Sequence, residues 1–227
     1  IITYNRTFSN DHRLNVTLLY SRENRNFNST TAEATQFDND VLGFNNLSLG
    51  VIPKTYSSAW EENSISYMSR LNYVYKDRYM FTGTVRRDGY SGFGAGTKFA
   101  VFPSFSFAWV TSDEPFFKDR ISWLYLKERI SWGKNGNQGI GRYSSLSKMG
   151  ITNYVYDSSS TVAIYPSTLG NSSLKWESTA SLNFGLDWGL FNRRISGSFD
   201  FYTAKTSDLL IQRSIPTTTG YSSVWSN

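Results

Sequence analysis

Apolar and polar residues alternate with a period of two over long stretches of this chain. In the clearest stretch, 179–188, apolar side chains occupy the even positions from Ala180 to Trp188, and polar residues or glycine occupy the odd ones. Successive side chains of a β-strand point to opposite faces, so this period predicts a strand with one apolar and one polar face. The alternation returns over 194–201 after a short break, which predicts a hairpin.

The same period predicts further antiparallel strands upstream. Alternating segments flank short polar breaks, or stand alone, at 2–8, 14–20, 65–75, 79–86, 101–109 and 124–132. One residue breaks the pattern, because Glu128 falls on the apolar face of its segment. A carboxylate that faces lipid is costly. Glu128 therefore implies either a different register or neutralisation by Lys127 or Arg129.

The links between these segments alternate in length. Short links are predicted at 9–12, 76–78 and 190–193, and long polar links at 25–59 and 133–173. The links 89–98 and 113–122 are intermediate in length, and a helical turn is expected at 114–117. Outer-membrane barrels combine short periplasmic turns with longer extracellular loops, and their tilted strands need about 9–11 residues. The pattern predicts an all-β fold, part of a large antiparallel transmembrane β-barrel, with about nine or ten strands in this chain.

Composition supports strands that cross a bilayer. Aromatic residues make up 17% of the chain, and those near predicted strand ends suit interfacial girdles. They are Tyr73, Tyr75, Tyr79, Trp109, Trp123, Trp132, Trp176 and Trp188. The mean hydropathy of −0.40 and the lack of a long apolar run exclude a spanning helix. They leave a barrel open, because its lipid-facing and lumen-facing residues alternate.

Charge and residue usage exclude most other functions. The net charge of +5 comes from scattered basic residues, so we expect no nucleic-acid partner. The chain has no cysteine and a single histidine, His12, which lies in a predicted turn. A catalytic triad, a thiol nucleophile or a multi-histidine metal site therefore has too few residues. We expect no catalytic residue, metal or cofactor, and no enzyme activity.

Seven segments resemble the SusC-like family of TonB-dependent transporters from Bacteroidetes. In the order of that family they are 70–79 (RLNYVYKDRY), 85–89 (VRRDG), 102–106 (FPSFS), 133–139 (GKNGNQG), 174–177 (LKWE), 185–191 (GLDWGLF) and 216–220 (PTTTG). Two positions depart from the family pattern: Gly92 stands where arginine is frequent, and Glu128 where an apolar residue is usual.

The resemblance implies a barrel of about 22 strands with a plugged lumen. Residues 1–227 would then form a partial β-barrel domain, with the plug, the TonB-contacting segment and the last strands outside this sequence. The implied function is active import of oligosaccharides or peptides across the outer membrane. The implied partners are a SusD-like surface lipoprotein, TonB through an N-terminal part, and outer-membrane lipid.

Two alternatives remain open on the sequence. A soluble all-β carbohydrate-binding module would show the same period of two, with its apolar faces packed together. A passive porin or adhesin would share the barrel wall but would not need TonB. Within the resemblance, the residues expected to face substrate lie in the predicted loops: Tyr90, Phe93, Asn135, Asn137 and Gln138.

Overall fold

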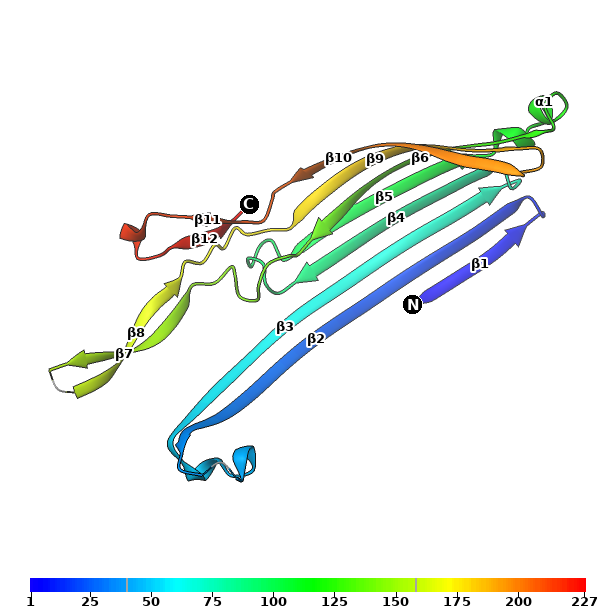
Figure 1. Cartoon of the computed structure of the whole chain (residues 1–227). Helices are drawn as coiled ribbons and strands as arrows, with labels where there is room; N and C mark the ends of the chain where they lie inside the picture. Colours follow the sequence, from blue (N-terminus) through cyan, green and yellow to red (C-terminus); the bar gives the residue numbers. More distant parts are fainter. Residues whose placement is uncertain (40, 158) are drawn as a thin grey trace. The chain divides into compact units, whose positions relative to one another are not determined.

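The computed structural model describes residues 1–39, 41–157 and 159–227, and antiparallel β-strands dominate it (Figure 1). The strands are β1 (Ile2–Phe8), β2 (His12–Phe37), β3 (Gly50–Tyr75), β4 (Tyr79–Tyr90), β5 (Phe99–Trp109), β6 (Leu124–Asn137), β7 (Lys148–Tyr156), β8 (Ser159–Thr168), β9 (Glu177–Leu190), β10 (Ile195–Ser207), β11 (Ile211–Ser214) and β12 (Ser223–Ser226). The helical turns are η1 (Gly43–Asn45), η2 (Leu47–Leu49), η3 (Thr111–Asp113), α1 (Pro115–Lys118) and η4 (Thr217–Thr219). No helix of the described part has the length and apolarity needed to cross a bilayer.

Eight strands form one sheet in the order β1-β2-β3-β4-β5-β6-β9-β10. The described registers are antiparallel. In the β3–β4 hairpin, for example, Tyr75 lies opposite Tyr79 and Ser64 lies opposite Tyr90. Tight turns close the hairpins with positive φ angles, for example 51° at Lys76 and 54° at Asp77. Turns of this hand match the right-handed twist of paired strands. The predicted hairpins at 2–20, 65–86 and 179–201 are confirmed.

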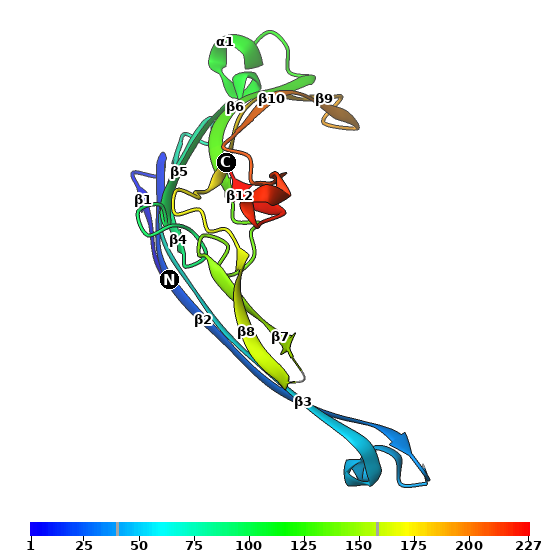
Figure 2. The ribbon, with the colours of Figure 1, turned by 90° about the vertical axis from the view of Figure 1, so that its left-hand side faces the viewer.

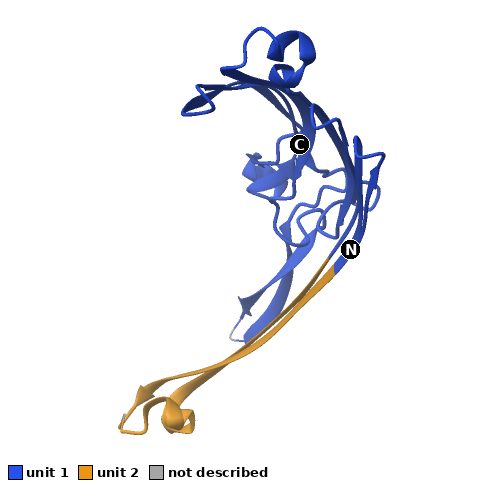
Figure 3. Cartoon of the chain, turned by 90° about the vertical axis from the view of Figure 1, so that its right-hand side faces the viewer, with its two compact units in different colours: residues 1–22, 64–227 blue, residues 23–63 orange. Residues whose placement is uncertain are grey.

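The chain divides into two compact units, residues 1–22 with 64–227 and residues 23–63 (Figure 3). The second unit is a hairpin with a stacked pair, Phe27 and Trp60, whose ring centroids lie 5.4 Å apart. Asn24 Nδ2 also lies 2.8 Å from oxygens of Glu61 and Asn63. The prediction of a polar loop over 25–59 was wrong, because such cross-strand contacts extend β2 to Phe37 and let β3 begin at Gly50.

A second expected loop, 133–173, also contains strands. It holds β7 and β8, which pair only with each other, and β11 pairs with β12 further along the chain. The described residues therefore form twelve strands, more than the nine or ten expected. Most side chains of the β7–β8 hairpin are exposed on both faces. Without a buried face, nothing imposes the period of two that identifies a strand in a sequence. The expected helical turn is confirmed as α1.

The part of the sheet that belongs to the first unit is curved, and the loops with β11 and β12 lie on its concave side (Figure 2). The small hydrophobic core lies there too and is made by loops rather than by the sheet alone. We call it the loop cluster; it consists of Tyr90, Phe93, Phe102, Ile140, Leu174 and Trp176. Large apolar side chains on most of the sheet remain exposed instead.

Candidate functional site

One face of the sheet carries apolar side chains in register across neighbouring strands. We call it the apolar face. Its rows run across β3, β4, β5, β6, β9 and β10; one row is Tyr73, Phe81, Phe107, Ile130, Phe184 and Phe201. Many of these side chains are exposed: Phe81, Phe107 and Phe184 are 40–47% exposed, and Phe199 and Phe201 are 68% and 71% exposed. Soluble monomers rarely expose contiguous apolar patches of this kind. A bilayer is the environment that such a face fits.

Aromatic rings gather at one end of the sheet, where the links 9–11, 76–78 and 191–194 are short. We call it the short-turn end. The ring of Tyr79 lies 6.0 Å from that of Tyr75 and 6.2 Å from that of Trp109. His12 begins β2 there, and its Nδ1 lies 2.7 Å from the hydroxyl of Tyr73. Such a belt is typical of the boundary between lipid and water.

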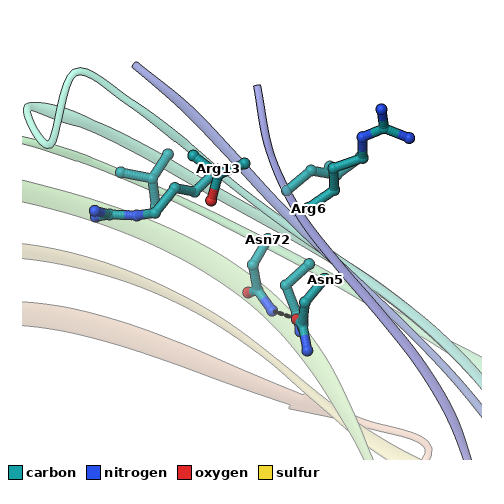
Figure 4. Close-up of a pocket in the computed structure, with 8 residues that line it drawn as sticks. Asn5, Arg6, Arg13 and Asn72 are labelled. Atoms are coloured by element: carbon teal, nitrogen blue, oxygen red, sulfur yellow. Dashed lines mark hydrogen bonds between the residues drawn. The ribbon is translucent and has the colours of Figure 1, made fainter. Parts of the chain in front are cut away.

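The opposite face, the polar face, bears amide and hydroxyl side chains. A ladder of hydrogen bonds crosses β1 to β4: Asn15 bonds to Asn5, Asn72 Nδ2 donates to Asn15 Oδ1 at 3.0 Å, and Thr82 Oγ1 donates to Asn72 Oδ1 at 2.9 Å. The row continues through Ser106, Ser131 and Asn183. A shallow pocket lies along the first part of the ladder, where Figure 4 shows Asn5 beside Asn72 and Arg6 pointing away from both.

Charged residues on the polar face form ion pairs. Arg129 on β6 lies 2.8 Å from Asp187 on β9 and 3.3 Å from Asp200 on β10. Their side chains remain about one-third exposed, so solvent screens the pairs and each contributes little stability. Because charges and amides on this face are accessible, the face suits a water-filled lumen.

Glu128 does lie on the apolar face, where its register places it opposite Trp109 on β5 and Leu186 on β9. The predicted neutralisation by Lys127 or Arg129 was wrong, because neighbours along a strand point to opposite faces. Instead, the hydroxyl of Thr111 donates a hydrogen bond to the Glu128 carboxylate. Thr111 belongs to η3 at the short-turn end, so the carboxylate sits near the lipid boundary, where its cost is lowest.

A second carboxylate, Glu114, anchors the link between β5 and β6. Arg78 Nη1 lies 2.7 Å from its Oε2, and Trp109 Nε1 donates to its Oε1 at 3.1 Å. Hydrogen bonds from the Tyr79 hydroxyl and then from the Trp109 indole hold the pKa of Glu114 below its usual value. The residue is 7% exposed. Only a helical turn was predicted here, because the two ion-paired residues are 36 positions apart in the sequence.

The loop cluster joins segments that are far apart in the sequence. Trp176 packs against Phe93 and Phe102, with ring centroids 5.0 and 5.5 Å away, and its Nε1 donates to the carbonyl of Lys98 at 2.9 Å. The hydroxyl of Thr97 donates to the Leu174 carbonyl at 2.6 Å. Phe102 shares its face of β5 with Ser104 and Ser106, so the cluster covers the polar face at the long-loop end, where links 91–98 and 138–176 lie.

The five residues expected to face substrate fall into two groups. Tyr90 and Phe93 belong to the loop cluster, and Phe93 is only 1% exposed. Asn135, Asn137 and Gln138 are exposed at the end of β6 and just beyond it. Asn137 Nδ2 donates to Glu177 Oε1 at 3.1 Å. Contact of these residues with substrate stays a prediction.

Sequence reasoning missed most of the loop cluster. Phe102, Ile140 and Leu174 were not among the expected site residues, and Trp176 was assigned to an interfacial belt. The available signal was their place within or next to the segments 102–106, 133–139 and 174–177 that carry the family resemblance. Nothing in the sequence shows that these three segments meet.

Comparisons with known proteins agree over nearly the whole chain. The sequence profile of the family described as "TonB dependent receptor-like, beta-barrel" matches residues 2–227. TonB-dependent receptor P3 of Formosa agariphila is 36% identical over 223 residues, which are 98% of this chain and 22% of that protein. TonB-dependent receptor SusC of Bacteroides thetaiotaomicron is 39% identical over 161 residues, which are 69% of this chain and 16% of that protein.

Solved structures show the same arrangement of strands. The RagAB peptide importer in its "closed-closed" state matches with a TM-score of 0.86 and 28% identity, over 99% of this chain and 25% of that chain. Its "open-open" state matches with a TM-score of 0.79 and 29% identity, over 99% of this chain and 24% of that chain. The chain thus spans about a quarter or less of the length of each of these relatives.

Proposed function

We propose that this chain, which belongs to the TonB-dependent receptor-like β-barrel family, forms part of the wall of an outer-membrane active transporter. One observation carries the proposal: a single sheet has an exposed apolar face and, opposite it, an accessible polar face. Lipid would cover the first face, and a hydrated passage would lie along the second. The family consists of receptors and transporters rather than enzymes.

The proposed cargo is an oligosaccharide or a peptide. The amides and hydroxyls of the polar face support a passage for polar solutes, and RagAB is described as a peptide importer. A SusD-like surface lipoprotein is the proposed partner at the long-loop end, as the similarity to SusC implies. Tyr90, Phe93, Asn135, Asn137 and Gln138 remain the proposed substrate-side residues.

Residues 1–227 are proposed to be one partial barrel domain of a longer protein. The length of the relatives supports this assignment, because the chain matches only 22% of TonB-dependent receptor P3 of Formosa agariphila. The plug, the TonB-contacting segment and the last barrel strands would lie elsewhere in that protein. Import would be driven through TonB, and the wall would supply the passage.

Deletion of the full-length gene tests the proposal. We expect lost uptake of at least one oligosaccharide or peptide, restored by the wild-type gene, and co-purification of a surface lipoprotein with the tagged transporter. Normal uptake of every glycan and peptide tried, with no lipoprotein bound, would contradict it. Removal of TonB separates active import from a passive porin, because uptake through a porin would continue.

Expression of residues 1–227 alone tests the remaining alternative. A soluble carbohydrate-binding module would purify as a monomer without detergent. The apolar face favours a barrel segment instead, whose exposed rows and open edges at β1 and β10 require lipid, detergent or further strands. We expect the segment to precipitate unless detergent is present.

A further inference from the structure

The apolar face has an uneven distribution of charge. On β4, β5, β6, β9 and β10 its charged residues are Glu128, Arg87, Lys134 and Lys205. Glu128 lies near the short-turn end and is bonded to Thr111. The other three are all cations. The acidic residues of these strands other than Glu128 lie on the polar face: Asp88, Glu177, Asp187 and Asp200.

The register places the three cations towards the long-loop end of their strands. Lys134 and Lys205 both lie opposite Ala180 and thus share one row, while Arg87 lies one row beyond Val85. Arg87 is eight residues past Tyr79, the first residue of β4, and Lys134 and Lys205 are each ten residues past the first residue of their own strands. At about 3.3 Å per residue and a tilt of about 40°, these separations correspond to about 20–25 Å along the membrane normal.

That height equals the thickness of the apolar band of an outer-membrane barrel, about 25 Å. The short-turn end has the aromatic belt of one boundary, so the cations lie at the other boundary. Short turns face the periplasm in such barrels, and the cations therefore face the outer leaflet. Long basic side chains at this depth can extend their charged ends out of the hydrocarbon.

The three cations have no carboxylate partner in the part of the chain that the structure describes. Among the residues that the structure describes, no ion pair involves Arg87, Lys134 or Lys205, whereas Arg86 next to Arg87 is paired with Asp88 on the polar face. Arg87 instead stacks its guanidinium over the ring of Phe99, 4.5 Å from the centroid. This stacking restrains the arginine and leaves its donors available to an anion.

We propose that Arg87, Lys134 and Lys205 form a binding surface for the phosphate groups of a phosphorylated glycolipid in the outer leaflet. Charge complementarity selects this ligand, because the cations lie at headgroup depth and no described carboxylate is paired with them. The planar guanidinium of the arginine can donate two parallel hydrogen bonds to phosphate oxygens, and the two lysine ammonium groups act on them as point charges. The inference rests on the outer-membrane location of the proposed function.

The test compares two variants of the full-length transporter, purified from outer membranes in mild detergent. The first variant is R87Q/K134Q/K205Q. The matched control, R70Q/R86Q/K127Q, removes the same charge from the polar face. Native mass spectrometry would measure the affinity for lipid A, for lipid A with its phosphates removed, and for phosphatidylglycerol. Heat-modifiable migration in gels would show that each barrel is folded.

We expect about a 100-fold loss of affinity for lipid A in the first variant, from about a fivefold loss for each cation. The control should keep its affinity, and the wild type should bind dephosphorylated lipid A as weakly as the first variant binds lipid A. Equal affinity of the first variant and wild type for lipid A, or equal or tighter binding of phosphatidylglycerol by the wild type, would overturn the inference. Either result could occur in a barrel that still imports its cargo, so failure here is distinguishable from failure of the proposed function.

Discussion

The environment of a residue on this sheet depends mainly on which face its position in the strand assigns it to, because successive side chains point to opposite faces. Glu128 and Arg129 are neighbours of opposite charge, yet one faces Trp109 and Leu186 while the other binds Asp187 and Asp200 across the polar face. Their charges cannot compensate each other because the strand separates them. A sequence reading that treats adjacent charges as partners fails at such positions for this reason.

A new charge should destabilise the barrel more on the apolar face than on the polar face. Phe105 and Ser106 are neighbours on β5, on the apolar and polar face respectively. We expect Phe105→Lys to destabilise the barrel by about 2–4 kcal/mol, because its ammonium would lie near the bilayer midplane. Ser106→Lys should cost far less because its side chain would enter water. Urea unfolding of the full-length protein in lipid vesicles measures both, and equal destabilisation would contradict the assigned faces.

Acid should weaken the attachment of the β5–β6 link. The pKa of Glu114 is lower in the folded protein than in the unfolded chain, where it is about 4.3. Its stabilising contribution is therefore complete above that pH and is lost as pH falls through the folded pKa. Glu114→Gln should lower the melting temperature at pH 7 and reduce its fall on acidification.

Asp113→Asn is the control for Glu114→Gln, since Asp113 is exposed next to Glu114. Thermal melts of the full-length protein in detergent, recorded between pH 7 and pH 3, make the comparison. If Glu114→Gln has the same melting temperature as wild type and Asp113→Asn at every pH, the ion pair with Arg78 does not contribute to stability.

At the scale of elements, the loop cluster fixes the links 91–98 and 138–176 to each other. Segments 91–98 and 170–176 meet through backbone contacts as well as through side chains, since the Gly94 amide donates to the Leu174 carbonyl at 3.2 Å. There is no room for a side chain at this contact, because a Cβ on Gly94 would lie 1.8 Å from the carbonyl oxygen of Ser172. The cluster therefore depends on a glycine that the sequence alone shows only as part of the predicted link 89–98.

Gly94→Ala should open the loop cluster. The added methyl group must displace the Ser172 backbone, which would separate the two links and expose Phe93 and Trp176. We expect faster proteolysis of both links in the folded full-length protein and an altered fluorescence spectrum of Trp176. Gly96→Ala is a matched control, because a Cβ there meets no atom within 4 Å. Equal protection of the two variants would contradict this role of the cluster.

The strands with one buried or lipid-facing side could be predicted from the sequence, and those without one could not. The segments that became β4, β5, β6, β9 and β10 alternate clearly because each has two unlike faces. The outer part of β2 and β3 and the β7–β8 hairpin are exposed on most positions, so their residues carry no such pattern. Contacts across large sequence separations, such as Trp176 with Lys98, are likewise absent from any local pattern.

At the scale of the whole molecule, the fold explains why the polar composition is compatible with a membrane. The chain has 39% hydrophobic residues, but the register places most of those on β4, β5, β6, β9 and β10 on one face of the sheet. The polar half faces the other way, towards the loop cluster. The proposed transport across the outer membrane is therefore supported by how the residues are distributed between the two faces, which an average over the sequence hides.

Single cysteines test this distribution most directly, since these 227 residues contain none. In a cysteine-free full-length protein, cysteines at Phe81, Phe107 and Phe184 should resist a charged, membrane-impermeant maleimide, and a lipid-soluble quencher should reach fluorophores placed there. Cysteines at Thr82, Ser106 and Asn183 should react with the charged reagent in intact outer-membrane vesicles and escape the quencher. Equal reactivity of the two sets, or the reverse pattern, would contradict a sheet with lipid on one side and water on the other.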